Sequence, residues 1–194
     1  MKFFHSISGL SLAAILLASS AIPAFAETPA NTFVVARNIA DVITFDPAEV
    51  FEFTAGRVVS NLYERVMMFE PDDLTKLVGG VTESYEFSED GKVIKIKLRQ
   101  GMTFHSGNPV TAEDVAYSLG RVIKLNKTPA FIVKQIGWTP ENVDEAVKAL
   151  DTDTVQISIL ADLSPALVLN LLSANVASVV DKKLDYPKEP SLKD

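Results

Sequence analysis

The chain has 194 residues, with 18 Lys and Arg against 25 Asp and Glu, a formal net charge of −7, and no cysteine. This charge, and the lack of a basic cluster with interleaved aromatics, argue against nucleic-acid binding, because phosphates require a positively charged face. Without cysteine, disulfides and a cysteine-linked lipid anchor are excluded, so folding must depend on a hydrophobic core.

Residues 1–26 are typical of a cleavable secretory signal peptide. Lys2 supplies a positive end, residues 10–18 form an apolar run, and Ala24-Phe25-Ala26 is a small-x-small cleavage site. The run is shorter than the roughly 20 residues of a membrane-spanning helix, which disfavours the alternative of an uncleaved anchor. We therefore expect cleavage after Ala26 and export of a 168-residue chain to the periplasm.

The first part of the exported chain predicts a strand, a helix and a second strand. Residues 32–36 read as a strand, and a turn is expected at Asp46-Pro47. From Glu49 a helix is expected, with its start near Phe53 and its apolar residues recurring at three and four positions. A strand over residues 66–69 follows.

Residues 89–121 carry the clearest local signals. Residues 88–91 form a turn in which Gly91 can adopt a positive φ. From residue 93 to 99 apolar and basic side chains alternate, which predicts a strand with one buried face, and residues 85–87 are its candidate partner.

A capped helix is predicted after this strand. Thr111 is the expected N-cap, and Glu113 and Asp114 place negative charge at the positive end of the helix. Apolar residues from Val115 onward have helical spacing, and the helix should end near Asn126.

The last third predicts shorter elements. Residues 140–150 allow a helix beginning at Pro140 or a strand, and we favour a short helical turn over 140–144 with a strand from Ala146. Another strand is expected over 155–159, a helix after Ser164-Pro165, a final strand over 177–180 and a disordered tail over 181–194.

One run resembles a known family. Its characteristic positions are, in order, Ser-Glu-Asp-Gly-Lys (88–92), the alternating strand, Gly101, Phe104-His105-Ser106-Gly107, and Pro109 through Val115 with Ser118. This order is similar to that of the extracytoplasmic solute-binding proteins of the peptide, nickel and opine class, family 5. Leu62-Tyr63-Glu64 also matches this family, while Tyr85 stands where its members usually carry tryptophan.

The resemblance implies an α/β fold: a mixed α+β lobe of a type II-like periplasmic binding protein, with a mixed sheet and flanking helices. Residues 27–180 would be the N-terminal part of the first lobe. In the family a second lobe follows, so we expect an N-terminal fragment of about a third of such a protein. One lobe alone has nothing to close against.

The implied function is the periplasmic substrate-binding component of an ABC importer for oligopeptides, dipeptides or related solutes. Its expected partners are a small-molecule or peptide ligand and the membrane permease, with a monomeric chain and no nucleic acid. The alternative is an exported interaction protein without a transport role, or an inactive gene remnant. Reading the DNA downstream of Asp194 separates an interrupted gene from a remnant.

The resemblance also implies which residues approach the ligand. Phe51 and Phe53 follow the first strand, and Phe131 and Trp138 follow the helix that contains Ser118. Aromatic faces cover apolar or peptide-like ligands at low entropy cost. The competing interpretation for each of the four is an ordinary core residue.

No catalytic, metal or cofactor site is predicted, and we expect no enzyme activity. His105 is the only histidine after the signal peptide, and its flanks carry no nucleophile motif. The paired carboxylates of Glu113 and Asp114 are explained by their place at a helix start. The segment between Gly101 and Gly107 lacks the lysine of a phosphate loop.

Overall fold

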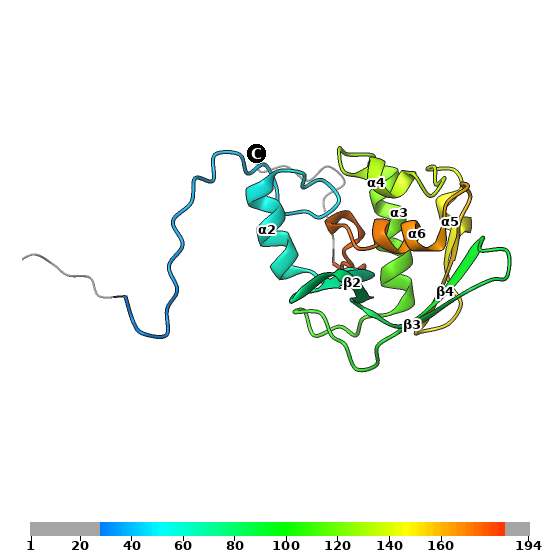
Figure 1. Ribbon diagram of the computed structural model, residues 1–194, viewed down its shortest axis with the longest axis horizontal. Helices are drawn as coiled ribbons and strands as arrows, with labels where there is room; N and C mark the ends of the chain where they lie inside the picture. The colour runs from blue at the N-terminus through cyan, green and yellow to red at the C-terminus, as the bar shows by residue number, and fades with distance from the viewer. Residues whose placement is uncertain (1–27, 185–194) are drawn as a thin grey trace, which may run out of the picture. The chain divides into compact units, whose positions relative to one another are not determined.

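The computed structural model describes residues 28–184 (Figure 1). The chain divides after Arg37 into two units. Residues 28–37 of the first unit contain neither helix nor strand, so the strand predicted over 32–36 is wrong. Phe33 is 91% exposed. A strand needs a partner to satisfy its backbone groups, and the described residues offer none to this segment.

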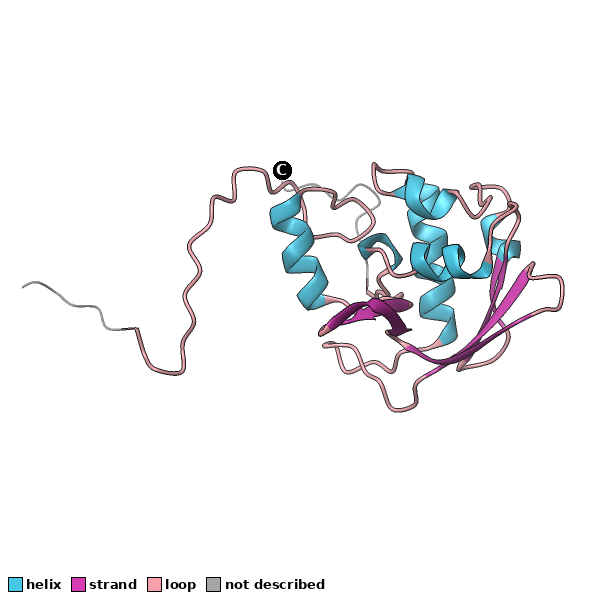
Figure 2. Ribbon diagram, in the orientation of Figure 1, coloured by secondary structure: helices cyan, strands magenta, loops and turns pink. Residues whose placement is uncertain are grey.

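The second unit combines helices and strands along its length (Figure 2). Its elements are α2 (Phe53–Leu62), β1 (Met67–Glu70), β2 (Asp73–Gly79), β3 (Thr82–Phe87), β4 (Val93–Leu98), α3 (Ala112–Leu125), α4 (Ala130–Lys134), α5 (Val143–Ala146), β5 (Val147–Ala149), β6 (Thr154–Ser158), α6 (Pro165–Leu171) and the 3-10 helix η2 (Asn175–Ala177). This content confirms the α/β class.

The strands form a hairpin of β1 and β2 and a four-stranded sheet in the order β3-β4-β6-β5. In the sheet, Ile96 of β4 lies opposite Tyr85 of β3 and Val155 of β6. Every strand pair among residues 28–184 is antiparallel, so the described residues do not contain the mixed sheet that we expected. Tight turns connect most consecutive strands, and such connections impose antiparallel pairing.

Strand β4 is as the alternation predicted. Ile94, Ile96 and Leu98 are at most 2% exposed. The lysines between them face solvent. The turn before the strand uses Gly91 at φ 67°, a conformation that glycine adopts without steric cost. The strand therefore has one packed and one solvated face.

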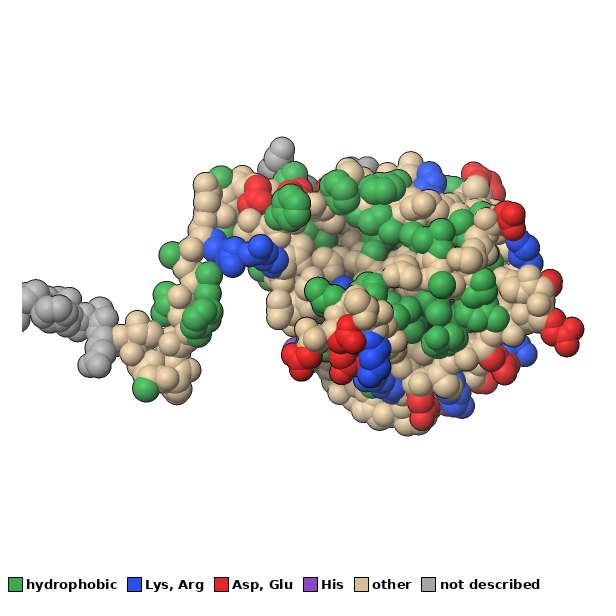
Figure 3. Space-filling view, in the orientation of Figure 1, with side chains coloured by type: hydrophobic (Ala, Val, Ile, Leu, Met, Phe, Trp, Pro, Cys, Tyr) green, Lys and Arg blue, Asp and Glu red, His purple; other side chains and the backbone are tan. Residues whose placement is uncertain are grey.

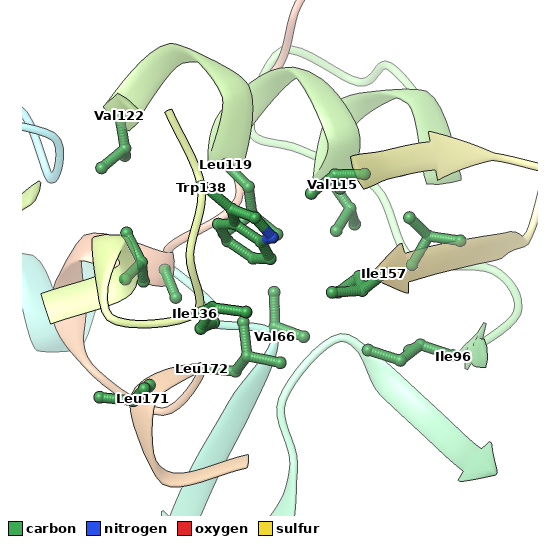
Figure 4. Close-up of a cluster of buried hydrophobic side chains, with 14 of the residues drawn as sticks. Val66, Ile96, Val115, Leu119, Val122, Ile136, Trp138, Ile157, Leu171 and Leu172 are labelled. Carbon is green, nitrogen blue, oxygen red and sulfur yellow. The ribbon is translucent and has the colours of Figure 1, made fainter. Parts of the chain in front are cut away.

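Helix α3 packs its apolar stripe over the sheet. Thr111 and Asp114 form a capping box, in which the Thr111 backbone N–H donates to Asp114 Oδ2 at 2.9 Å. At the other end Asn126 is left-handed, at φ 50°, and the helix stops where expected. Figure 4 shows Val115 and Leu119 of α3 facing the sheet residue Ile157, so helix and sheet share one core.

The last third agrees with the prediction in part. The short helix α5 leads into β5, as favoured from the sequence. The final strand predicted over 177–180 is wrong. Ala177 belongs to the 3-10 helix η2, and Ser178 forms a single isolated bridge with Arg65.

The expected tail begins too early at residue 181. Asp181 is 2% exposed and accepts hydrogen bonds from Ser106 Oγ at 2.6 Å and Asn108 Nδ2 at 2.7 Å. Both bonds lower the pKa of the Asp181 carboxyl below its ordinary value, and the bond from Asn108 has the larger effect. Lys182 N–H donates to Asp114 Oδ1 at 3.0 Å. The chain is thus held past the predicted boundary, while residues 185–194 and the predicted signal peptide lie outside the described residues.

Candidate ligand-binding site

A cavity of about 320 Å³ opens beside the first turns of α2. It is bordered by the segment before α2, by one face of α2, by the residues around α4 and by η2. The residues that line it are Val50, Phe51, Glu52, Phe53, Gly56, Arg57, Ser60, Pro129, Ile132, Asn175 and Val176.

Two of the four predicted ligand contacts line this cavity, and a third stands next to them. Phe51 and Phe53 are lining residues, 57% and 90% exposed. Phe131 is 54% exposed and meets Phe51 edge to face, with ring centroids 5.9 Å apart. Segments 80 positions apart in the sequence thus form one aromatic surface. Exposed aromatic side chains beside a cavity are typical of binding sites, because the hydrophobic effect favours covering them.

Trp138 lies elsewhere. It is 1% exposed, and its indole N–H donates to the Ser158 carbonyl at 2.9 Å. In Figure 4 its ring lies beside Leu119 and Ile136. The structure thus favours the core interpretation for this residue. Its buried polar atom is satisfied by the backbone, as buried tryptophans require.

The polar part of the cavity comes from α2 and η2. Asn175 Nδ2 donates to the Gly56 carbonyl at 3.1 Å, and Asn175 Oδ1 accepts from Ser60 Oγ at 3.0 Å. These bonds fix the helix face that carries Arg57 against η2. No motif in the sequence marks Arg57 or Asn175 as a site residue, although residues 53, 56, 57 and 60 share a face of the helix by their spacing.

A buried ion pair holds the segment before the cavity. Arg121 of α3 makes two hydrogen bonds to Asp46, Nη1 to Oδ1 at 2.8 Å and Nη2 to Oδ2 at 2.5 Å, and both side chains are 8% exposed. Next to the pair, burial and then the Asp46 charge raise the pKa of Tyr63 above its ordinary value. The chain just before Phe51 is therefore attached to the main core by a bidentate contact.

Two other cavities differ in character. One of about 700 Å³ follows the outer face of α3 and has a charged border, where Lys124 Nζ lies 2.7 Å from Asp144 Oδ1. One of about 380 Å³ is bordered by Tyr63, Phe104 and His105. His105 is the only histidine among the described residues, and no group there of three or more His, Asp or Glu could hold a metal ion. Neither cavity contains a predicted ligand contact.

The described helices are all too short or too polar to cross a membrane. On the face seen in Figure 3, apolar side chains gather over α4 and α6. Phe131 and Leu167, from these two helices, are 54% and 41% exposed.

The fold is that of solved peptide-binding proteins. The Escherichia coli murein tripeptide binding protein MppA matches with a TM-score of 0.62 and 24% identity, over 72% of this chain and 29% of that one. Listeria monocytogenes OppA bound to peptide matches with a TM-score of 0.61 and 20% identity, over 72% and 29%. At these identities the similarity shows the fold alone.

Sequence comparison defines the family. Residues 76–193 match the family described as bacterial extracellular solute-binding proteins, family 5 Middle. This stretch is more than half of the chain, which therefore belongs to that family. The resemblance that the motifs of residues 88–118 suggested is confirmed.

Curated relatives agree. The probable D,D-dipeptide-binding periplasmic protein DdpA of Escherichia coli is 28% identical over 174 residues, 88% of this chain and 32% of the relative. Di/tripeptide-binding protein 1 of Pseudomonas aeruginosa is 28% identical over 142 residues, 66% of this chain and 26% of the relative. The matches thus span between about a quarter and a third of the length of these relatives.

Proposed function

We propose that this chain supplies part of the substrate-binding component of a periplasmic ABC importer for peptides or related solutes. The observation that carries the proposal is the aromatic surface of Phe51, Phe53 and Phe131 beside a cavity of about 320 Å³, in a chain of this family. DdpA is described as a probable periplasmic dipeptide-binding protein and the Pseudomonas relative as a di/tripeptide-binding protein, which supports the same class of ligand.

In this proposal the three phenylalanines contact the apolar part of the ligand. The lobe provides one side of the contact, and closure of a second lobe over the ligand would shift the protein to the state that the membrane permease recognises. One side alone should bind weakly. We expect millimolar affinity for the described lobe, and we propose that it is monomeric.

Export is part of the proposal. A signal peptide cleaved after Ala26 would deliver the chain to the periplasm, the compartment named in the description of DdpA. Fractionation by osmotic shock should recover the mature chain in the periplasmic fraction.

The function is tested by expressing the gene from its own start codon and detecting binding of millimolar peptides to the isolated product by saturation-transfer NMR. Binding to the wild type that is lost from the Phe51→Ser/Phe53→Ser variant supports the proposal. Equal binding to this variant contradicts the assigned surface.

A further inference from the structure

The cavity beside α2 is lined by one cation, Arg57, and one anion, Glu52. Arg57 lines the cavity, and within residues 28–184 its guanidinium has no hydrogen bond or ion pair. Cations at the larger cavity differ, because Lys124 pairs with Asp144, and Lys182 with Glu113. An arginine that faces a cavity without a protein partner is available to a ligand.

The backbone adds to the positive character of this end of the cavity. Helix α2 begins at Phe53 and has no acidic residue in its first turn. The N-cap residue Glu52 makes no side-chain cap bond; its Oε2 accepts the Phe51 N–H at 3.2 Å instead. The positive end of the helix dipole is compensated in part by Glu52 and by Asp41, whose Oδ2 accepts the Thr54 N–H at 3.4 Å.

The remaining lining is apolar or hydrogen-bonded, apart from the Glu52 carboxylate, which accepts the Phe51 N–H with one of its two oxygens. Phe51, Phe53 and Ile132 provide apolar surface, and Asn175 is engaged with Gly56 and Ser60. The site therefore combines an aromatic wall with one guanidinium that has no partner among the described residues and one carboxylate, that of Glu52. Its complement is a small molecule that has a carboxylate next to an apolar side chain.

We propose that Arg57 binds the C-terminal carboxylate of a short peptide whose last side chain is apolar and lies against Phe51 and Phe53. This inference rests on the proposed function and assigns the orientation of the ligand. A planar guanidinium matches a carboxylate with two parallel hydrogen bonds, which lysine cannot reproduce. Because the contact is at an open cavity, we expect the carboxylate to increase affinity by about fivefold.

The test uses the exported chain, labelled with ¹⁵N and followed by NMR during titration with the dipeptide Ala-Phe or its C-terminal amide. We expect the amides of Phe53, Gly56 and Arg57 to shift with both ligands, and the acid to bind about fivefold more tightly. The variant Arg57→Gln should lose this preference and leave the affinity for the amide unchanged. Arg57→Lys should retain part of the preference, because it keeps the charge.

Lys95→Gln is the matched control, since it removes one exposed positive charge from the solvated face of β4. It should leave both titrations unchanged. Equal affinity of acid and amide, or an equal loss of both in Arg57→Gln, overturns the role of Arg57 and leaves the aromatic surface as the proposed contact. No shift at the cavity with either ligand contradicts the proposed function as well.

Discussion

Replacement of Phe53 by alanine should remove a ligand contact and leave the stability of the fold almost unchanged. Complete burial of a phenylalanine side chain stabilises a protein by about 1.5–3 kcal/mol. Phe53 is 90% exposed, so only about a tenth of this, ~0.2–0.3 kcal/mol, is available to the folded lobe. We therefore expect the free energy of unfolding to change by less than about 0.5 kcal/mol, as at other surface positions.

Val59 of the same helix is the matched control. It is 0% exposed and belongs to a small cluster with Val50 and Ala55. Val59→Ala removes two methyl groups, about 1.6 kcal/mol at ~0.8 kcal/mol each, and the cavity left behind adds to this. We expect a destabilisation of about 2 kcal/mol or more.

Both variants can be measured by urea unfolding. Trp138 is the only tryptophan and is buried, so its fluorescence reports loss of the main core, while circular dichroism reports α2 as well. A loss of more than about 1 kcal/mol in Phe53→Ala would refute the reasoning, because it would give the side chain a structural role. A Val59→Ala variant as stable as the wild type would also refute the reasoning.

The remaining predictions concern the ion pair, pH, peptide and export. Arg121→Met should lower the free energy of unfolding by about 3 kcal/mol in urea titrations, because it leaves the buried Asp46 carboxylate without its bidentate partner; a loss below about 1 kcal/mol would contradict this. A hydrogen bond from Lys97 lowers the pKa of Asp153 to about 2, below its ordinary 3.8, so the contribution of this carboxylate to stability is present above pH 4 and lost as pH falls toward 2. Asp153→Asn should therefore make the melting temperature depend less on pH over that window. An unchanged fall of the melting temperature in acid would argue against this role of Asp153. Peptide mixtures at about 0.1 mM should produce no saturable rise in melting temperature for residues 27–194 expressed alone, whereas a concentration-dependent rise would show that these residues suffice for binding. Sequencing of the secreted protein should find its N-terminus immediately after Ala26, and an N-terminus at residue 1 would exclude cleavage.

Local signals were enough to predict much of this fold. The alternation in β4, the turn at Gly91 and the cap at Thr111 are set by residues close in sequence, and the structure has them where expected. The strand predicted over 32–36 failed because strand formation depends on a partner that no local pattern reveals. Likewise, Asp181 is buried through contacts with a loop 73 to 75 positions away.

The candidate site was predictable only in part. Exposed aromatics near Phe51 and Phe131 could be proposed from the sequence and the family, but their edge-to-face contact is tertiary. Trp138 is aromatic like the three phenylalanines, and only the structure distinguishes it from them, because it is buried and its indole N–H is bonded to the Ser158 carbonyl. Arg57 was missed because a single surface arginine has no sequence signature. Its significance comes from the cavity it lines.

Photo-crosslinking in the periplasm tests the central claim most directly. Benzoylphenylalanine would be incorporated in place of Phe53, and in place of Leu74, which is 74% exposed on β2 and lines none of the cavities described above, as the control. We predict that irradiated protein substituted at Phe53 gains the mass of a peptide or similar small solute, while protein substituted at Leu74 does not. Equal labelling at both positions, or none at Phe53, would contradict the assignment of this aromatic surface as the ligand contact.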